Sequence, residues 1–284
     1  MKRYETRVIN QPLLQITCLL FLVAGLVLLP LLLISGCGRR DRADQPEAEL
    51  EELRKELGIK TQTKWSHDVI NQVQFYDREG RLVEEHWLNP KGVVVTSRVL
   101  EYDERTGRLD TTTWHRGLEA LKSRNVFRYD RRGNLIEDRW LTPFDEIRTR
   151  TEYIYEDDRL VEELKYDMSD NLISTTQYVY GDGHLAEMVV KDRRDRLTGR
   201  QQYSYDTAGN LLEELWFNEE NENVLQRSYR YDEGQVIGMT QYDNGEFTHS
   251  LEYEYDSNGL ILRESWRNEA EEIFFENLYT YEHF

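Results

Sequence analysis

The stretch YDRRGNL, from Tyr129 to Leu135, decides the fold of this chain. Asp130 can accept backbone hydrogen bonds where a turn begins, and Gly133 can take the positive φ that is needed where the turn ends. Tyrosine before the turn and leucine after it are residues that strands favour. The stretch therefore predicts a β-hairpin closed by a type I turn with a glycine bulge.

The same pattern recurs along the chain at nearly constant spacing. Successive turn tyrosines are 24 to 27 residues apart. They are Tyr76, Tyr102, Tyr129, Tyr155, Tyr180, Tyr205, Tyr231, Tyr255 and Tyr281. Such regularity indicates internal repeats of one supersecondary unit.

Each unit is predicted to hold two strands and two turns. Tyrosines two residues apart, such as Tyr153 and Tyr155, point to the same face of a strand. A second turn signal lies in mid-unit, for example at Thr142-Pro143-Phe144-Asp145. The sequence thus predicts an all-β fold of tandem β-hairpin repeats, about 25–26 residues each, over residues 69–284. We expect an extended, twisted antiparallel meander or an open spiral.

One short helix is expected before the repeats, over residues 46–58. Pro46 suits its first turn, and Gly58 follows its end. Leu50, Leu53 and Leu57 fall on one face at helical spacing. This face predicts a lid on the first repeat, with a dimerising helix as the alternative.

Composition limits both the core and the partners. Of 284 residues, 39% are hydrophobic and 32% are charged, which predicts a thin architecture without a thick core. The formal net charge is −18. An acidic chain of this kind is not expected to bind nucleic acid.

The N-terminal segment predicts export and membrane attachment. An almost unbroken apolar run from Leu19 to Ile34 follows basic residues, so residues 1–36 are a signal peptide or a membrane anchor, and residues 37–45 a tether. Ile34-Ser35-Gly36-Cys37 resembles the lipobox of bacterial lipoproteins. The resemblance implies a lipid such as palmitate on Cys37 and a lipid-anchored place in the bacterial cell envelope, on its periplasmic or surface face. An uncleaved transmembrane anchor is the alternative.

The turns resemble the YD repeats of the RHS family. Clear matches run from Tyr76 to Leu82, from Tyr129 to Leu135 and from Tyr205 to Leu211, and the resemblance covers residues 69–284. In that family the strands wrap into a hollow shell or spiral, which often encloses a toxin or displays carbohydrate- or cell-binding surfaces. Neither a C-terminal toxin domain nor the self-cleavage motif that usually precedes one is present. The resemblance therefore implies a fold more than an activity.

Catalytic and metal-binding patterns are absent from the sequence. The histidines are scattered, without the spacing of a zinc site, and no nucleophile or phosphate-loop motif occurs. We therefore expect no enzymatic activity, no metal and no cofactor. The speculative binding residues are Trp87, Trp114 and Trp140, which occupy equivalent positions in three consecutive units. An aligned row of exposed aromatic rings suits sugars or extended peptides, whereas the alternative role is packing between units.

These observations predict a lipid-anchored envelope repeat protein that acts as a noncatalytic protein-binding or scaffolding surface. The partners would be the membrane, through the N-terminal lipid or anchor, and an envelope protein or a glycan. One alternative is a glycan-binding surface that uses the tryptophan row. Another is a structural spacer without a ligand.

Overall fold

The computed structural model of the protein describes residues 47–284, which form one helix and eighteen strands. The helix α1 spans Glu47–Leu57. The strands are β1 (Ile59–Ser66), β2 (Val69–Tyr76), β3 (Leu82–Leu88), β4 (Val94–Tyr102), β5 (Leu109–Arg116), β6 (Ala120–Tyr129), β7 (Leu135–Leu141), β8 (Ile147–Glu156), β9 (Arg159–Asp167), β10 (Leu172–Gly181), β11 (His184–Asp192), β12 (Leu197–Tyr205), β13 (Leu211–Phe217), β14 (Asn223–Asp232), β15 (Gln235–Asp243), β16 (Glu246–Tyr255), β17 (Ile261–Arg267) and β18 (Ile273–His283).

Several predictions concern residues that lie outside the described part of the chain. They are the signal peptide or anchor over residues 1–36, the tether over residues 37–45 and the lipid on Cys37. Within residues 47–284, no helix has both the length and the apolar character needed to cross a membrane.

The turn after β6 has the predicted geometry. The Asp130 carboxylate accepts hydrogen bonds from the backbone N–H groups of Arg132 (2.8 Å), Gly133 (2.7 Å) and Asn134 (2.9 Å). Gly133 has a φ of 104°, which residues with a side chain rarely adopt. The strand register shifts just before Tyr129, which marks the bulge. The prediction of a hairpin turn held by aspartate and glycine is confirmed.

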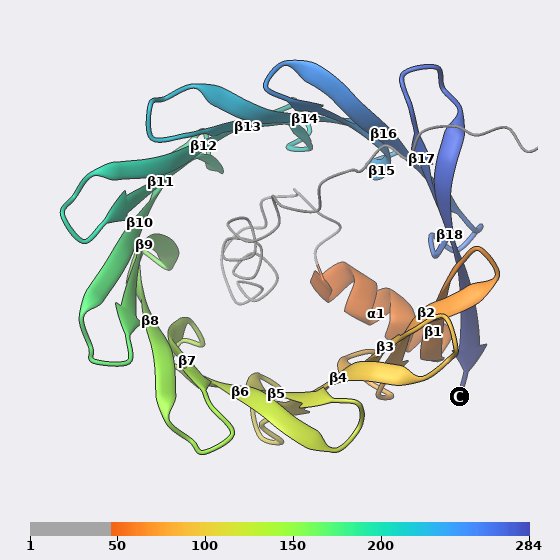
Figure 1. Cartoon of the computed structure of the whole chain (residues 1–284), viewed down its shortest axis with the longest axis horizontal. Coiled ribbons are helices and arrows are strands. Elements are labelled where there is room, and N and C mark those ends of the chain that lie inside the picture. The colour runs from red at the N-terminus through yellow and green to blue at the C-terminus, as the bar shows by residue number, and fades with distance from the viewer. Residues whose placement is uncertain (1–46) are drawn as a thin grey trace, which may run out of the picture. The chain divides into compact units, whose positions relative to one another are not determined.

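The strands close into a ring. Every strand from β1 to β17 pairs antiparallel with the next one, and β18 pairs with β1 (Figure 1). The sheet is thus a closed 18-stranded antiparallel β-barrel, and the prediction of an open meander or spiral is wrong. Closure leaves no free strand edge, because β1 supplies the partner that β18 would otherwise lack.

Strand β1 was not part of the predicted array, which began at residue 69. It carries no Tyr-Asp turn, yet it pairs with β2 on one side and with β18 on the other. Strand β18 contains Tyr281, the last of the nine turn tyrosines. Its partner in the ninth pair of strands is β1, which lies near the start of the described residues.

Helix α1 distinguishes the inner wall of the barrel from the outer wall. It lies within the ring of strands (Figure 1). Its Leu53 and Leu57 pack against a buried cluster of Ile59, Tyr76 and Leu260. The side of β2 that bears Tyr76 therefore faces inward, and the alternation of side chains along each strand assigns the other residues.

The two ends of the barrel carry different turns. We call the end with the Tyr-Asp turns the aspartate rim, and the end with the mid-unit turns the mid-unit rim. At the aspartate rim, tyrosine hydroxyls join neighbouring units by donating hydrogen bonds to backbone carbonyls of the preceding unit. These bonds are Tyr102 to Leu82 (2.8 Å), Tyr129 to Leu109 (2.9 Å), Tyr180 to Leu160 (2.9 Å), Tyr255 to Val236 (2.8 Å) and Tyr281 to Ile261 (2.8 Å).

Helix α1 covers the first Tyr-Asp turn. At two later turn tyrosines, the arginine after the preceding turn glycine lies over the ring: the Arg81 guanidinium is 4.7 Å from the Tyr102 ring centre, and that of Arg108 is 5.6 Å from the Tyr129 ring centre. The first unit has no such neighbour along the chain. Arg54 of α1 takes that place, because its guanidinium lies 4.5 Å from the Tyr76 ring centre and its Nε donates to the Gly80 carbonyl at 3.0 Å.

Candidate functional site: the inner wall of the barrel

A belt of carboxylates runs along the inner wall. In five units an acidic residue stands three positions after the aliphatic residue that follows the Tyr-Asp turn. The residue opposite it on the paired strand faces inward, so the acidic side chain faces inward too. We call these five residues the inner belt: Glu85, Asp138, Glu163, Glu214 and Glu264. The position is set by the Tyr-Asp turn, so equivalent residues lie at equivalent heights in the barrel.

Glu85 is held in a dense polar network. It is 3% exposed, accepts hydrogen bonds from Gln72 and from Gln74 (3.0 Å), and forms an ion pair with Arg98 at 2.5 Å. Several donors satisfy its charge, as a buried carboxylate requires. Glu85 is therefore fixed in position on the inner wall.

Lys165 lies between two members of the belt. Its positive charge acts on both Asp138 and Glu163. Asp138 accepts a hydrogen bond from Asn125 at 3.0 Å, and Glu163 accepts one from the Tyr178 hydroxyl at 2.5 Å. Burial raises the pKa of both carboxyls and lowers the pKa of Lys165, each against the effect of the opposite charges. The three groups form the most strongly perturbed part of the belt.

The other two carboxylates also have basic partners. Glu264 lies 3.2 Å from the Lys64 ammonium and accepts a hydrogen bond from Asn277 at 2.9 Å. Glu214 lies 3.8 Å from the Arg227 guanidinium and accepts from the Tyr229 hydroxyl at 3.1 Å. Five acids and four bases thus give the inner belt a small negative balance. Such a surface suits polar solutes and does not strongly attract either sign of charge.

The three predicted binding tryptophans lie on the inner wall. Trp87 and Trp114 stack on each other, with ring centres 5.5 Å apart and ring planes at 16°. The Arg98 guanidinium lies 5.2 Å from the Trp114 ring centre and 5.9 Å from that of Trp87. Trp140 is apart from this pair, and Arg148 lies 5.4 Å from its ring centre. The structure brings two of the three together and pairs each ring with an arginine.

The outer wall is charged. Glu137, next to Asp138 in sequence, faces outward and lies 3.1 Å from Arg128 and 2.8 Å from Arg139. Similar outer pairs join Arg200 with Glu187 (3.1 Å), Arg267 with Glu252 (2.7 Å) and Arg263 with Glu276 (3.4 Å). A barrel that spans a lipid bilayer presents an apolar band on its outer face instead. Exposed apolar side chains stand among these ion pairs on the same wall, as at Ile154, Val179 and Leu278.

The inner belt was missed at the sequence level, although a signal for it exists. The sequence showed that side chains alternate between the two faces of each strand, but it did not show which face the barrel would enclose. The acidic residues recur at one fixed position after the turn, and a comparison of units would have found them. Among residues 47–284, no group of three or more histidine, cysteine or acidic residues could hold a metal ion.

Comparisons with known proteins give distant likenesses to solved structures only. The structure is similar to a porin-like protein from Bacteroides uniformis (10% identity, 79% of this chain and 98% of that chain, TM-score 0.42) and to one from Bacteroides vulgatus (13%, 80% and 99%, TM-score 0.39). It is also similar to TcdB2-TccC3 (12% identity, 72% of this chain and 16% of that chain, TM-score 0.22). No family model and no curated protein matches the sequence.

At a TM-score of 0.22 the TcdB2-TccC3 likeness is too distant to test the YD-repeat resemblance, which stays a prediction. Similarity at these TM-scores assigns no function to the chain. The class of protein is therefore defined by its own geometry, which is a closed antiparallel β-barrel with a polar inner wall and a charged outer wall.

Barrel closure corrects the predicted function. The prediction of a lipid-anchored repeat scaffold required a sheet that presents an open surface, and the closed barrel has none. The glycan-binding alternative required an exposed, aligned tryptophan row, and the spacer alternative predicted buried or isolated tryptophans and no uncovered patch. The closed barrel contradicts the scaffold prediction together with both alternatives.

Proposed function

We propose that the protein is a noncatalytic hollow barrel whose lumen admits a polar solute, either as a receptacle or as a conduit. The observation that carries this proposal is the contrast between the two walls of one closed sheet. The inner wall holds aromatic rings and the paired charges of the inner belt, whereas the outer wall holds ion pairs suited to water.

Two neighbouring threonines of β10 offer a matched test of access to the lumen. Thr176 pairs with Glu163 and faces inward, and Thr175 pairs with Leu164 and faces outward. Both are half-buried. In a chain with Cys18 and Cys37 replaced by serine, each threonine is changed to cysteine in turn. The rate of maleimide labelling is then measured with a small reagent and with reagents on long polymer chains.

We expect Thr176→Cys to react with the small maleimide and to react many times more slowly with the large ones. Thr175→Cys should react with all of them at similar rates, because its reagent arrives from bulk water. Absence of reaction at Thr176→Cys with the small reagent would show that the lumen admits nothing. Equal rates at both positions with the largest reagent would show that the barrel is not closed. Either outcome contradicts the proposal.

We further propose that the barrel resides in the bacterial cell envelope and is attached there by a lipid on Cys37. The apolar run from Leu19 to Ile34 and the small residues before Cys37 support this location. Mass spectrometry of the protein purified from membranes should find an acylated Cys37 as the first residue. The Cys37→Ala chain should keep its N-terminal segment and lack the lipid. An unlipidated wild-type product would contradict the attachment and leave the lumen proposal untouched.

A further inference from the structure

The two rims of the barrel differ in the side chains at their turn tips. The mid-unit rim presents a large apolar side chain at each of four consecutive turns. These tip residues are Val93 (56% exposed), Leu118 (56%), Phe144 (84%) and Met168 (76%), and we call them the apolar arc. At the aspartate rim the corresponding tips are polar, as at Arg131-Arg132 and Ser257-Asn258. Four consecutive exposed apolar tips on one rim mark a contact surface.

The charge of the exposed side chains also differs between the apolar arc and the rest of the mid-unit rim. Exposed basic residues accompany the apolar arc and the next turn. These are Lys91, Arg116, Lys122, Arg148, Arg193 and Arg194. The tips after β13 and β17 instead carry exposed glutamates, which are Glu219, Glu220, Glu222, Glu269, Glu271 and Glu272.

Ion pairs neutralise several acids at and beside the apolar arc. Asp145 pairs with Arg124 at 2.6 Å, Asp170 with Arg150 at 2.6 Å, and Asp195 of the next turn with Lys191 at 2.9 Å. Glu119 and Glu146 remain, as does Asp167, which accepts hydrogen bonds from the backbone N–H groups of Ser169 and Asn171. The chain as a whole has a formal net charge of −18, which repels an anionic surface. Contact with such a surface is favoured only where the local charge of the protein is positive.

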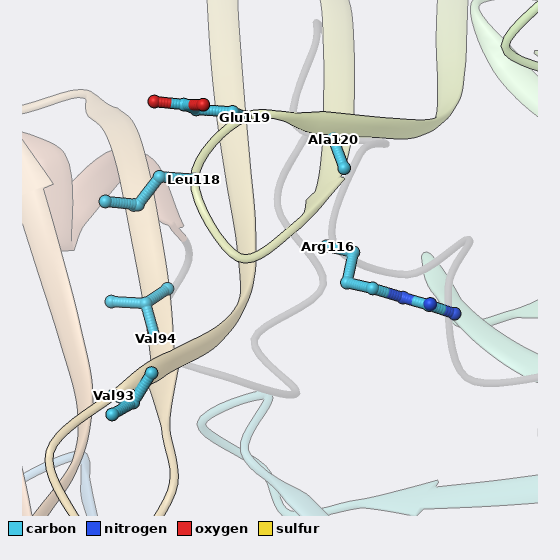
Figure 2. Close-up of a pocket in the computed structure, with 6 residues that line it drawn as sticks. All are labelled: Val93, Val94, Arg116, Leu118, Glu119 and Ala120. Carbon is cyan, nitrogen blue, oxygen red and sulfur yellow. The ribbon is translucent and has the colours of Figure 1, made fainter.

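The shape of the arc favours a fluid surface as its partner. Each tip offers one apolar side chain, and neighbouring hairpins are about two strand spacings apart, roughly 10 Å. Figure 2 shows the first two tips, where Val93, Val94 and Leu118 border a shallow, open pocket of about 450 Å³ with Arg116 beside it. Separate apolar tips with basic neighbours can each enter the interface of a bilayer, where rings and aliphatic chains meet charged headgroups.

We propose that the apolar arc docks on the surface of a lipid bilayer, with its tips in the interface and its basic side chains toward anionic headgroups. The barrel then stands on one arc of its mid-unit rim, and the glutamate-bearing tips are turned away from the membrane. The proposal does not depend on what the lumen admits.

Two serines at opposite rims allow a test on the full chain. Ser169 follows Met168 at the apolar arc, and Ser257 lies at an exposed tip of the aspartate rim. In the chain with Cys18 and Cys37 replaced by serine, each is changed to cysteine and labelled with an environment-sensitive fluorophore. The probe surface is a vesicle of phosphatidylcholine and phosphatidylserine, with brominated lipid as the quencher.

We expect the label at Ser169→Cys to shift to the blue and to be quenched by brominated lipid. The label at Ser257→Cys should respond to neither. Both chains carry the same N-terminal segment, so any vesicle binding through that segment is equal in the two. Changing Phe144 and Met168 to serine should abolish most of the response at Ser169→Cys, while circular dichroism shows an intact barrel. Equal responses at both rims, a silent label at Ser169→Cys, or an unchanged response after both serine substitutions would overturn the proposal. A response on a purified protein partner without lipid would do the same.

Discussion

Replacing Gly80 with alanine is expected to detach α1 from the barrel. Gly80 has a φ of +81°, and an added Cβ would overlap the Glu51 carbonyl of α1 and lie 2.8 Å from the Lys55 nitrogen. Left-handed backbone costs about 1–2 kcal/mol for a residue with a side chain. Overpacking against rigid backbone adds about 1–3 kcal/mol. We therefore expect a loss of about 2–5 kcal/mol in the free energy of unfolding.

Gly92→Ala is the matched control for backbone strain. Gly92 also has a positive φ, +75°, and its added Cβ would meet nothing within 4 Å. Its expected cost is only the strain of about 1–2 kcal/mol. Urea unfolding gives both values, and hydrogen exchange over residues 47–57 reports on α1. Rapid exchange of α1 in Gly80→Ala alone is the expected result. Equal exchange and equal stability in the two variants would show that α1 does not rest on the first turn.

Replacing Lys165 with methionine should give a large loss of stability that depends on pH. The change removes the positive charge that acts on Asp138 and Glu163 and leaves two carboxylates with raised pKa values on the inner wall. Removing one partner from a buried charge cluster costs about 3–5 kcal/mol near neutral pH. The pKa of both carboxyls should rise further in this variant, because the charge that lowered it is gone.

The sign of the pH dependence follows from those raised pKa values. A carboxyl whose pKa is higher in the folded state binds its proton more tightly when folded, so acid favours folding. The penalty of Lys165→Met should thus shrink as the pH falls through the folded pKa of the two carboxyls, and return as the pH rises. Urea unfolding at a series of pH values measures this trend.

Lys191→Met is the control for the loss of a lysine as such. Lys191 lies on the outer wall, 2.9 Å from Asp195, whose side chain is 83% exposed. An ion pair in water contributes about 0–1 kcal/mol, so this variant should lose little stability and show no comparable trend with pH. If the two variants lose the same free energy at every pH, the inner belt is as wet as the outer wall, and the account of its perturbed groups is wrong.

The belt itself could have been found in the sequence, and the enclosed space could not. Glu85, Asp138 and Glu163 recur at one position after the turn, which is a local regularity. Whether that position faces a lumen or open water depends on which way the sheet curves. Curvature comes from the twist and register of all strands together, and no single unit records it.

The sequence by itself determined the hairpin unit. Asp130 and Gly133 specify their turn by local hydrogen bonding and backbone freedom, and the alternation of residues on either side specifies strands. Only the tertiary structure decided that β1 and β18 meet, that Tyr76 faces inward and that Arg54 covers the first turn. These contacts join residues far apart in the chain, and they form because the ring leaves no strand edge unpaired. The turn is a local event, whereas the barrel is a property of the whole array.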